Sequence, residues 1–255
     1  MVYETIRVVR DGPRATLILS RPDRHNGITA RMLEETYTAL SSLADDRAVR
    51  VVVVTGSGTT FCPGADLGPG TSRRSSHDQW LNSYDVPMLL QEMEPVTVAA
   101  INGGCAGAGL GWAAACDLRY ATSSARFNTA FLNVGVAGDM GLPWTLGRLV
   151  GPALARELSF FPQKFSAERA LEIGVVNAVF DPKAFEQEVS DRVARLLTYS
   201  EDALRLLKRN YVASERLALR DFLSLETARH LELLSRPNTK KALDGFTRDT
   251  TPPMP

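Results

Sequence analysis

Short apolar runs alternate with longer amphipathic stretches along most of the chain. Residues 51–55, within a strand expected over 49–55, and residues 96–101 are largely apolar runs rich in β-branched side chains, which is typical of strands covered on both faces. Between the first of these and an earlier strand-like segment, residues 29–45 have the spacing of an amphipathic helix with Thr29 as its N-cap. The apolar face of that helix consists of Met32, Leu33, Thr36, Tyr37 and Leu40. This order of strand, helix and strand predicts a right-handed crossover in a parallel sheet.

The remaining pattern is a hairpin followed mainly by helices. Residues 3–9 and 15–19 indicate two strands joined across an Asp11-Gly12-Pro13 turn. Further helices are expected at residues 78–93, 141–150, 152–161, 167–173, 182–199, 201–213 and 217–235, with a last turn near 240. Short strands are expected at 118–121 and 178–180, whereas residues 68–77 indicate a polar surface loop.

We therefore expect an α/β core over residues 1–199 and a helical C-terminal region over residues 200–255. Leu223, Leu231 and Leu234 form part of an apolar stripe in the second region. The stripe is explained either by packing onto the core or by an interface between subunits.

Composition and charge exclude several classes of protein. The chain has 255 residues, with 29 basic against 29 acidic side chains and no long basic run, which argues against a nucleic-acid or membrane-surface protein. No apolar stretch is long enough for a transmembrane helix, and the first residues do not resemble a signal peptide. We expect a soluble, cytoplasmic protein.

The cysteines and histidines do not indicate a metal site. Cys62, Cys105 and Cys116 lack the spacing of zinc ligands or of a disulfide framework, and are better explained as small buried side chains. The three histidines are scattered along the chain without metal-ligand spacing. We predict no metal.

Two glycine-rich turns carry the candidate chemistry. Residues 103–109 contain four glycines between a buried strand and an apolar helix, so the N–H groups at the start of that helix point at the turn. A second glycine-rich turn, residues 56–67, follows the strand at 49–55. Two such turns can offer N–H groups from both sides to one oxygen, as an oxyanion hole requires. The alternative is that the glycines only allow close packing of a buried helix.

A dinucleotide site is a weaker explanation of the same glycines. Gly109, Gly111 and Ala114 fit the spacing G-x-G-x-x-[GA] after a strand. However, the bulky Trp112 lies inside the motif, and no acidic residue follows about 20 positions later.

Three motifs, in this order and spacing, resemble the enoyl-CoA hydratase/isomerase (crotonase) family. They are TGSGTTFCPGADL, VAAINGGCAGAGLGWAAACDLRYA and NVGVAGDMGLPWTLGRLVG, and RPDRHNG near the start extends the resemblance to most of the chain. The resemblance implies a crotonase-like spiral of ββα units followed by a helical C-terminal region. It also implies assembly as a homotrimer or a dimer of trimers.

The resemblance further implies an acyl-CoA thioester as substrate. Coenzyme A is then part of the substrate, and no separate cofactor is expected. The oxyanion-hole donors fall on the N–H groups of Ala65 and Ala108. The residues expected to contact the acyl-CoA are Asn26, Gly27, Ile28, Cys62, Pro63, Gly64, Asp66, Leu67, Gly107, Phe131 and Trp144.

The chain departs from the family's hydratases at the residues that add water. The positions of the two hydratase glutamates hold Gly111 and Phe131, neither of which can transfer a proton. Asp139 instead occupies a position where some family isomerases have an acidic residue and an aryl-CoA dehalogenase has its nucleophile. The alternative is a turn aspartate bonded to its own backbone, as Gly138-Asp139 invites.

These features predict double-bond isomerisation in an acyl-CoA, through an enolate held by the oxyanion hole, with Asp139 as the single acid/base. The alternatives are an enoyl-CoA hydratase of lipid degradation, a CoA-thioester hydrolase or lyase, and a non-catalytic acyl-CoA binder.

Overall fold

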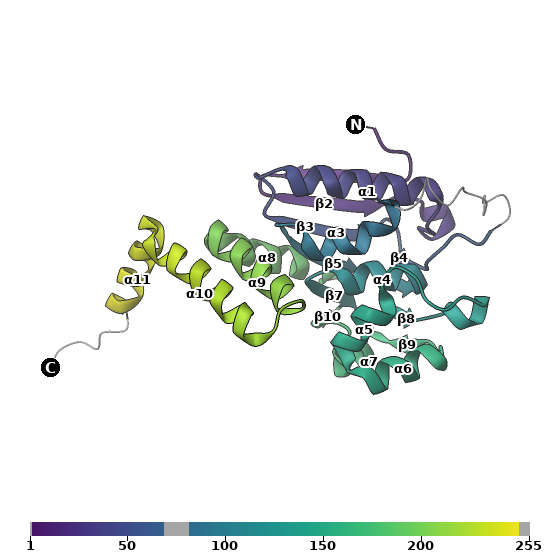
Figure 1. Cartoon of the computed structure of the whole chain (residues 1–255). Coiled ribbons are helices and arrows are strands. Elements are labelled where there is room, and N and C mark those ends of the chain that lie inside the picture. The colour runs from purple at the N-terminus through teal and green to yellow at the C-terminus, as the bar shows by residue number, and fades with distance from the viewer. Residues whose placement is uncertain (1, 69–81, 250–255) are drawn as a thin grey trace. The chain divides into compact units, whose positions relative to one another are not determined.

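The larger sheet of the protein is built from the apolar runs of the sequence. A computed structural model describes residues 2–68 and 82–249 (Figure 1). In spatial order the six strands of this sheet are β1 (Ile6–Asp11), β2 (Arg14–Leu19), β3 (Val51–Gly56), β5 (Val96–Ile101), β7 (Leu118–Thr122) and β10 (Ala178–Phe180). The β1–β2 hairpin is antiparallel, and every other neighbouring pair is parallel. The predicted parallel unit around the first long helix is confirmed.

A second, smaller sheet has the strand order β4-β6-β8-β9. Its strands are β4 (Thr60–Cys62), β6 (Gly104–Ala106), β8 (Arg126–Asn128) and β9 (Phe165–Ser166). Sequence reasoning missed this sheet because strands of two or three residues are too short to show a hydrophobic period. β6 lies inside the glycine-rich segment that the sequence indicated only as a turn.

Helices cover both faces of the larger sheet. The helices described up to residue 198 are α1 (Ala30–Asp45), α3 (Val86–Glu92), α4 (Gly107–Ala115), α5 (Leu142–Val150), α6 (Pro152–Phe160), α7 (Ala167–Glu172) and α8 (Phe185–Thr198). Leu17 and Val54 belong to the same buried cluster as Met32 and Leu40 of α1. The neighbouring strand residue Val53 points to the opposite face, where Phe185 of α8 lies. Figure 1 shows α1 and α3 along the first face.

Three short 3-10 helices complete the first of two compact units into which the chain divides. They are η1 (Pro22–Arg24), η2 (Asn82–Asp85) and η3 (Phe131–Val134). The units are Met1–Thr198 and Tyr199–Pro255.

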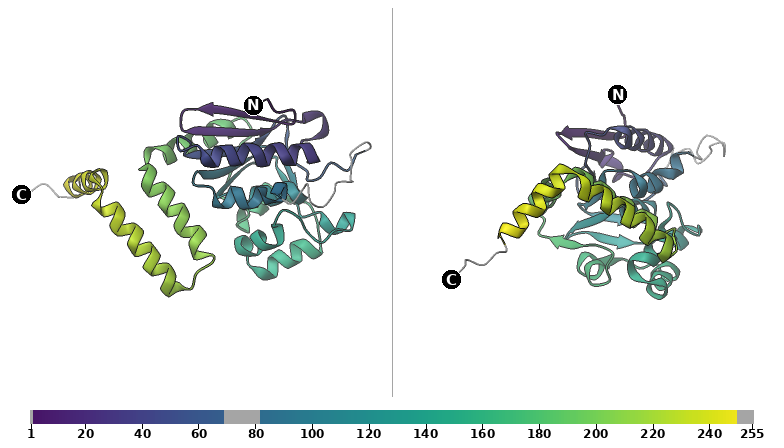
Figure 2. Two further views of the ribbon diagram at one scale, coloured as in Figure 1. Left: turned by 45° about the horizontal axis from the view of Figure 1, so that its top comes forward. Right: turned by 60° about the vertical axis from the view of Figure 1, so that its left-hand side comes forward.

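The second unit contains α9 (Glu201–Ser214), α10 (Leu219–Ser235) and α11 (Pro237–Asp249). The Ser200 side chain accepts a hydrogen bond from the N–H of Ala203 and so caps α9. The two views of Figure 2 show α9 and α10 as a helical hairpin followed by α11. α11 is a full helix, whereas the sequence predicted only a last turn near residue 240.

The helix expected at residues 78–93 is shorter in the described part of the chain. η2 precedes it, and α3 begins only at Val86. Pro87 at the second helical position fits this start, because the first helical N–H groups have no partner within a helix. Residues 78–81, and most of the expected loop at 68–77, lie outside the described residues.

The described residues show further features that bear on function. No helix among them is long and apolar enough to cross a membrane. Nor does any group of three or more His, Cys, Asp or Glu side chains within residues 2–68 and 82–249 have the geometry of a metal site. The three cysteines are free and buried, as the sequence indicated.

Candidate active site

The two glycine-rich turns meet at one edge of the larger sheet. β3 and β5 are parallel neighbours, with Val51 opposite Val96, so their carboxyl ends lie side by side. Asn102, directly after β5, donates from Nδ2 to the carbonyl oxygens of Gly56 and Gly58, at 2.9 Å each. Its Oδ1 accepts from the N–H of Gly56 at 3.2 Å. The parallel pairing and this side chain together join the turns that the sequence placed 40 residues apart.

The two turns also touch directly, at Gly64 and Gly109, where there is no room for a larger residue. A Cβ built on Gly64 would lie 3.3 Å from the nitrogen of Ala108 and 3.2 Å from the carbonyl oxygen of Ala106. A Cβ built on Gly109 would lie 2.4 Å from the carbonyl oxygen of Cys62, which is closer than real side chains come. Gly64 also has a φ of +98°, a conformation that other residues rarely adopt. The backbone of the 62–67 turn therefore lies directly against the first turn of α4.

The two predicted oxyanion-hole donors are available for a ligand. Ala65 pairs with Ile28 in a parallel bridge, but the bonds of that bridge run from the Ile28 N–H to the Gly64 carbonyl and from the Asp66 N–H to the Ile28 carbonyl. Ala108 is the second residue of α4, where a helix leaves N–H groups without intrahelical partners. Neither N–H has a hydrogen-bond partner within the described residues.

Asn26 holds the loop before α1 against the first glycine turn. Its side chain is fully buried and donates to the carbonyl oxygens of Ser57 and Thr60, while its Oδ1 accepts from the N–H of Arg21 and the hydroxyl of Ser57. The Cys62 side chain is equally buried, and this burial raises the pKa of its thiol to about 12. Both residues are buried as a whole, so a contact of either one with a ligand stays a prediction.

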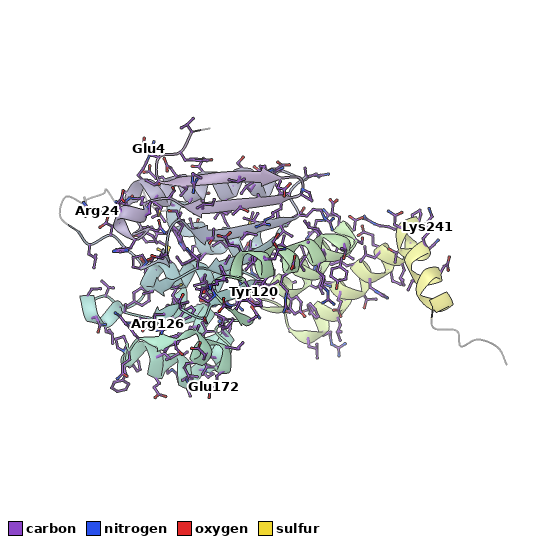
Figure 3. All side chains as sticks on the ribbon, turned by 180° about the vertical axis from the view of Figure 1, so that it is seen from behind. Glu4, Arg24, Tyr120, Arg126, Glu172 and Lys241 are labelled. Carbon is purple, nitrogen blue, oxygen red and sulfur yellow. The ribbon has the colours of Figure 1, made fainter. Side chains whose placement is uncertain are left out.

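Arg21 and Asp66 fix the outer part of the same turn. The Arg21 guanidinium donates to Asp66 Oδ2 at 2.8 Å and to the carbonyl oxygen of Gly27. The N–H of Gly68 donates to Asp66 Oδ1, and this bond, together with Arg21, lowers the pKa of the Asp66 carboxyl. Arg24, labelled in Figure 3, brings Nη1 within 3.0 Å of a Cβ built on Gly68. The edge of the turn that carries the exposed Pro63 and Leu67 is thus bordered by cations.

Asp139 lies in a turn with an unusual backbone. Gly138, Met140 and Gly141 have φ values of +134°, +49° and +66°. Asp139 Oδ1 accepts from the N–H of Met140 at 2.8 Å, as a turn aspartate would. Oδ2 has no hydrogen-bond partner within residues 2–68 and 82–249. Burial raises the pKa of the carboxyl, and the Met140 N–H opposes that rise only in part.

The Asp139 turn packs against the helix that carries Ala108. A Cβ built on Gly111, one helical turn after Ala108, would lie 3.3 Å from the carbonyl oxygen of Asp139. The structure therefore brings the Asp139 turn against α4, the helix that follows the second glycine turn, although the residues are far apart in the sequence.

Tyr84 of η2 is a neighbour of Asp139 that sequence reasoning missed. Burial raises the pKa of its phenol, and the Asp139 carboxylate raises it further. Because tyrosine is neutral over the range in which a carboxyl titrates, this influence acts on Tyr84 rather than on Asp139. Tyr84 is half exposed, so it borders the site from the solvent side. No motif surrounds it in the sequence that could have indicated this position.

Of the two aromatic residues expected at the acyl group, Phe131 lies near the start of α4 and Trp144 lies on α5. A Cβ built on Gly107 would lie 3.9 Å from Cε1 of Phe131, so that ring covers the start of α4 between the donors. Trp144 lies on α5, is 42% exposed and has the Arg148 guanidinium 3.5 Å from its ring centroid. Contact of Trp144 with an acyl group stays a prediction.

The glycines of the possible dinucleotide motif serve packing. Gly109 and Gly111 lie inside α4, not in the turn before it, and they face Cys62 and Met140. In a dinucleotide fold the first two glycines would border the pyrophosphate. This arrangement favours the oxyanion site over the dinucleotide site.

The fold and this site define an α/β protein with two backbone N–H donors at its glycine-rich turns and a half-buried carboxyl in a turn packed against α4. Residues 15–254 match the model of the enoyl-CoA hydratase/isomerase family. The chain therefore belongs to the enoyl-CoA hydratase/isomerase family.

Three similar proteins show the range of activities among its relatives. A 4-chlorobenzoyl coenzyme A dehalogenase from Arthrobacter is 36% identical over 78% of this chain and 74% of that protein. A crotonyl-CoA hydratase from Syntrophomonas wolfei is 33% identical over 82% and 81%. A peroxisomal Δ(3,5)-Δ(2,4)-dienoyl-CoA isomerase from Arabidopsis thaliana is 30% identical over 71% and 72%.

Known protein structures superpose on nearly the whole of this chain. Subunit I of an enoyl-CoA hydratase from Geobacillus kaustophilus superposes with a TM-score of 0.89 at 28% identity, covering 99% of this chain and 98% of that one. A Thermobifida fusca protein in complex with acetoacetyl-CoA superposes with a TM-score of 0.84 at 27% identity, covering 91% and 95%. The crotonase fold predicted from the sequence is confirmed.

Proposed function

We propose that this protein moves a carbon–carbon double bond in an acyl-CoA thioester. The thioester oxygen is held by the N–H groups of Ala65 and Ala108, which stabilise the negative charge that develops on it as an enolate forms. The Asp139 carboxylate removes a proton from one carbon and returns it to another. The reaction neither consumes water nor releases coenzyme A.

The observation that carries this proposal is the half-buried carboxyl of Asp139, in a turn whose backbone packs against α4 one helical turn after Ala108. A proton shuttle needs a carboxyl with a pKa closer to the working pH than an exposed aspartate has, and burial raises the pKa of Asp139 in that direction. Gly111 and Phe131, which stand at the hydratase glutamate positions implied by the family resemblance, have no proton to transfer.

The acyl-CoA follows the segments that form the first glycine turn. Its pantetheine and adenine lie along residues 26–28 and 62–67, and the exposed Pro63 carbonyl accepts from the adenine amino group. The complex of the Thermobifida fusca protein with acetoacetyl-CoA supports this class of ligand. Phe131 borders the acyl group where it meets the thioester.

The test is a panel of 2-enoyl-, 3-enoyl- and β-hydroxyacyl-CoA thioesters, followed by absorbance, free thiol and mass. Isomerisation gives a 2-enoyl product of unchanged mass from the 3-enoyl substrate and no free thiol. A product heavier by one water would identify a hydratase, and thiol release would identify a hydrolase. Binding without turnover of any thioester would leave a non-catalytic binder.

A second candidate uses Asp139 as a nucleophile. The 36% identity to a 4-chlorobenzoyl-CoA dehalogenase favours it. In that reaction the carboxylate attacks the ring carbon that bears chlorine, chloride leaves, and water hydrolyses the resulting ester. Chloride release from 4-chlorobenzoyl-CoA is the measurement that separates it from isomerisation. The raised pKa of Asp139 suits a proton shuttle better than a nucleophile that must stay ionised.

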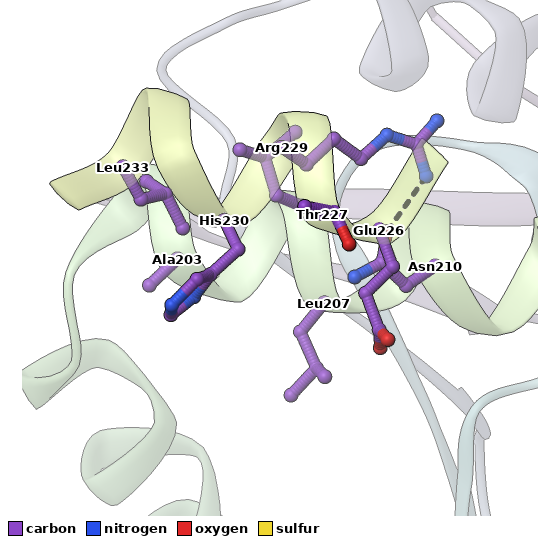
Figure 4. Close-up of a pocket in the computed structure, with 9 residues that line it drawn as sticks. Ala203, Leu207, Asn210, Glu226, Thr227, Arg229, His230 and Leu233 are labelled. Atoms are coloured by element: carbon purple, nitrogen blue, oxygen red, sulfur yellow. Dashed lines mark hydrogen bonds between the residues drawn. The ribbon is translucent and has the colours of Figure 1, made fainter. Parts of the chain in front are cut away.

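The C-terminal unit supports assembly with further copies of the chain. α10 has no buried residue, and Leu219, Leu223 and Leu231 are 72%, 48% and 60% exposed. A pocket of about 460 Å³ lies between α9 and α10, where the Arg229 guanidinium donates to Asn210 Oδ1 at 2.7 Å (Figure 4). We propose a homotrimer or a dimer of trimers. Light scattering on the parent and on Leu231→Glu tests it, since a charge in the interface should lower the mass.

A further inference from the structure

Position 111 has no room for a side chain. A Cβ built on Gly111 would lie 2.7 Å from the Cβ of Met140, 2.9 Å from its carbonyl oxygen and 3.3 Å from the carbonyl oxygen of Asp139. Real Cβ atoms essentially never approach another heavy atom within 3.0 Å. Either position 111 is glycine, or the turn that carries Asp139 moves away from α4.

That turn has few ways to adapt in place. Met140 is 5% exposed, so its side chain is held in the core, and its φ of +49° is already costly for a residue with a Cβ. The N–H of Leu142 donates to the Asp139 carbonyl at 3.1 Å and ties the turn to the start of α5. A side chain at position 111 would therefore displace the whole turn.

We infer that Gly111 is a positioning residue for proton transfer, because its missing side chain lets the Asp139 turn lie against α4 one helical turn after Ala108. This inference rests on the proposed function. It also explains why position 111 carries no carboxylate: the Met140 backbone occupies the space that a carboxyl-bearing side chain there would need. A Cβ built on Gly109 would be as crowded, but by Cys62, so the absence of a side chain at position 109 lets the 62–67 turn, which carries Ala65, lie against α4.

The test is Gly111→Ala, with Gly147→Ala of α5 as the matched control. A Cβ built on Gly147 meets nothing within 4 Å. The account predicts that Gly111→Ala lowers kcat by about 10²-fold, the loss expected for a reacting group displaced by about 1 Å. KM and acetoacetyl-CoA affinity should stay within about twofold, because the CoA segments are elsewhere. Gly147→Ala should match the parent.

The pH profile of kcat separates positioning from general damage to the fold. The titratable group that faces Asp139 from η2 is Tyr84, which stays neutral in the acidic range. A displaced Asp139 is less buried, so the acidic limb of the Gly111→Ala profile should move to lower pH. A purely structural loss would lower the rate and leave the limb unchanged, and that result would overturn the inference.

A second variant tests the contact itself. In Gly111→Ala/Met140→Gly the Cβ at 2.7 Å is removed, and the backbone freedom of glycine at position 140 lets the carbonyl oxygen at 2.9 Å turn aside. The double variant should recover at least tenfold in kcat, or fold where Gly111→Ala does not. No recovery would overturn the inference. Parent turnover in Gly111→Ala while Asp139→Asn is inactive would also overturn it, whereas parent turnover in both variants would refute the proposed function.

Discussion

Replacing Ala65 by proline isolates one oxyanion donor from the rest of the fold. The bridge beside it uses the carbonyl of Gly64 and the N–H of Asp66, so proline at position 65 removes only an N–H that has no partner within the described chain. The Ala65 side chain is exposed, which leaves room for the ring. The expected change is therefore chemical, with the fold retained.

The magnitude follows from what one donor contributes to a developing oxyanion. Loss of such a donor costs about 10²- to 10³-fold in turnover, which corresponds to roughly 2.7–4 kcal/mol of transition-state stabilisation. The assay is kcat for 3-enoyl-CoA conversion, with thermal unfolding measured on the same samples. Ala65→Ser is the matched control, since it keeps the N–H and should stay within a few-fold of the parent.

Two results would refute this reasoning. One is a folded Ala65→Pro protein that turns over at the parent rate. The other is a loss in Ala65→Ser as large as that in Ala65→Pro, because the side chain and not the N–H would then matter. Ala108 would remain the single backbone donor in the first case.

Three further predictions concern binding and stability. Acetoacetyl-CoA at 100 times its Kd should stabilise the native state by about 2.7 kcal/mol and raise Tm by roughly 5 °C or more. An unchanged Tm at a saturating ligand concentration would contradict acyl-CoA binding. Asn26→Ala should lower the free energy of unfolding by on the order of 3 kcal/mol, because the part-buried carbonyl of Thr60 and N–H of Arg21 lose their hydrogen-bond partner. Denaturant unfolding measures this loss, and a value below about 1 kcal/mol would disprove the prediction. The raised pKa of Asp139 means that folding favours the protonated carboxyl, so its contribution to stability is fully present below about pH 3.9 and is lost as pH rises through the folded pKa. Asp139→Asn should therefore gain stability over the parent as pH rises from about 4 to 7, and a difference independent of pH would show that burial does not act on this carboxyl.

The sequence predicted the larger elements because their patterns are long. Thr29 caps α1 through a bond from the Met32 N–H, and β5 has the predicted bounds. A helix of 16 residues has a clear amphipathic period, and β5 is an apolar run rich in β-branched residues that Pro95 and Gly103 bound. The short strands β4 and β8 have no such period. α3 begins later than predicted, because residues 82–85 form η2 before it.

For the site, the sequence could indicate residue types but not their contacts. It placed candidate donors at Ala65 and Ala108, and parallel pairing of β3 with β5 brings their turns together. It could not show that Tyr84 faces Asp139, or that Met140 fills the space beside Gly111, because those contacts depend on how distant segments pack.

The most direct test of the central claim is the effect of Asp139→Asn on binding and turnover, measured on the same preparation. Asparagine keeps the shape of the side chain and the hydrogen bond from the Met140 N–H but cannot act as a base. The account predicts acetoacetyl-CoA affinity close to that of the parent and a fall in 3-enoyl-CoA isomerisation of about 10²-fold or more. An Asp139→Asn protein that binds and isomerises like the parent would contradict the claim.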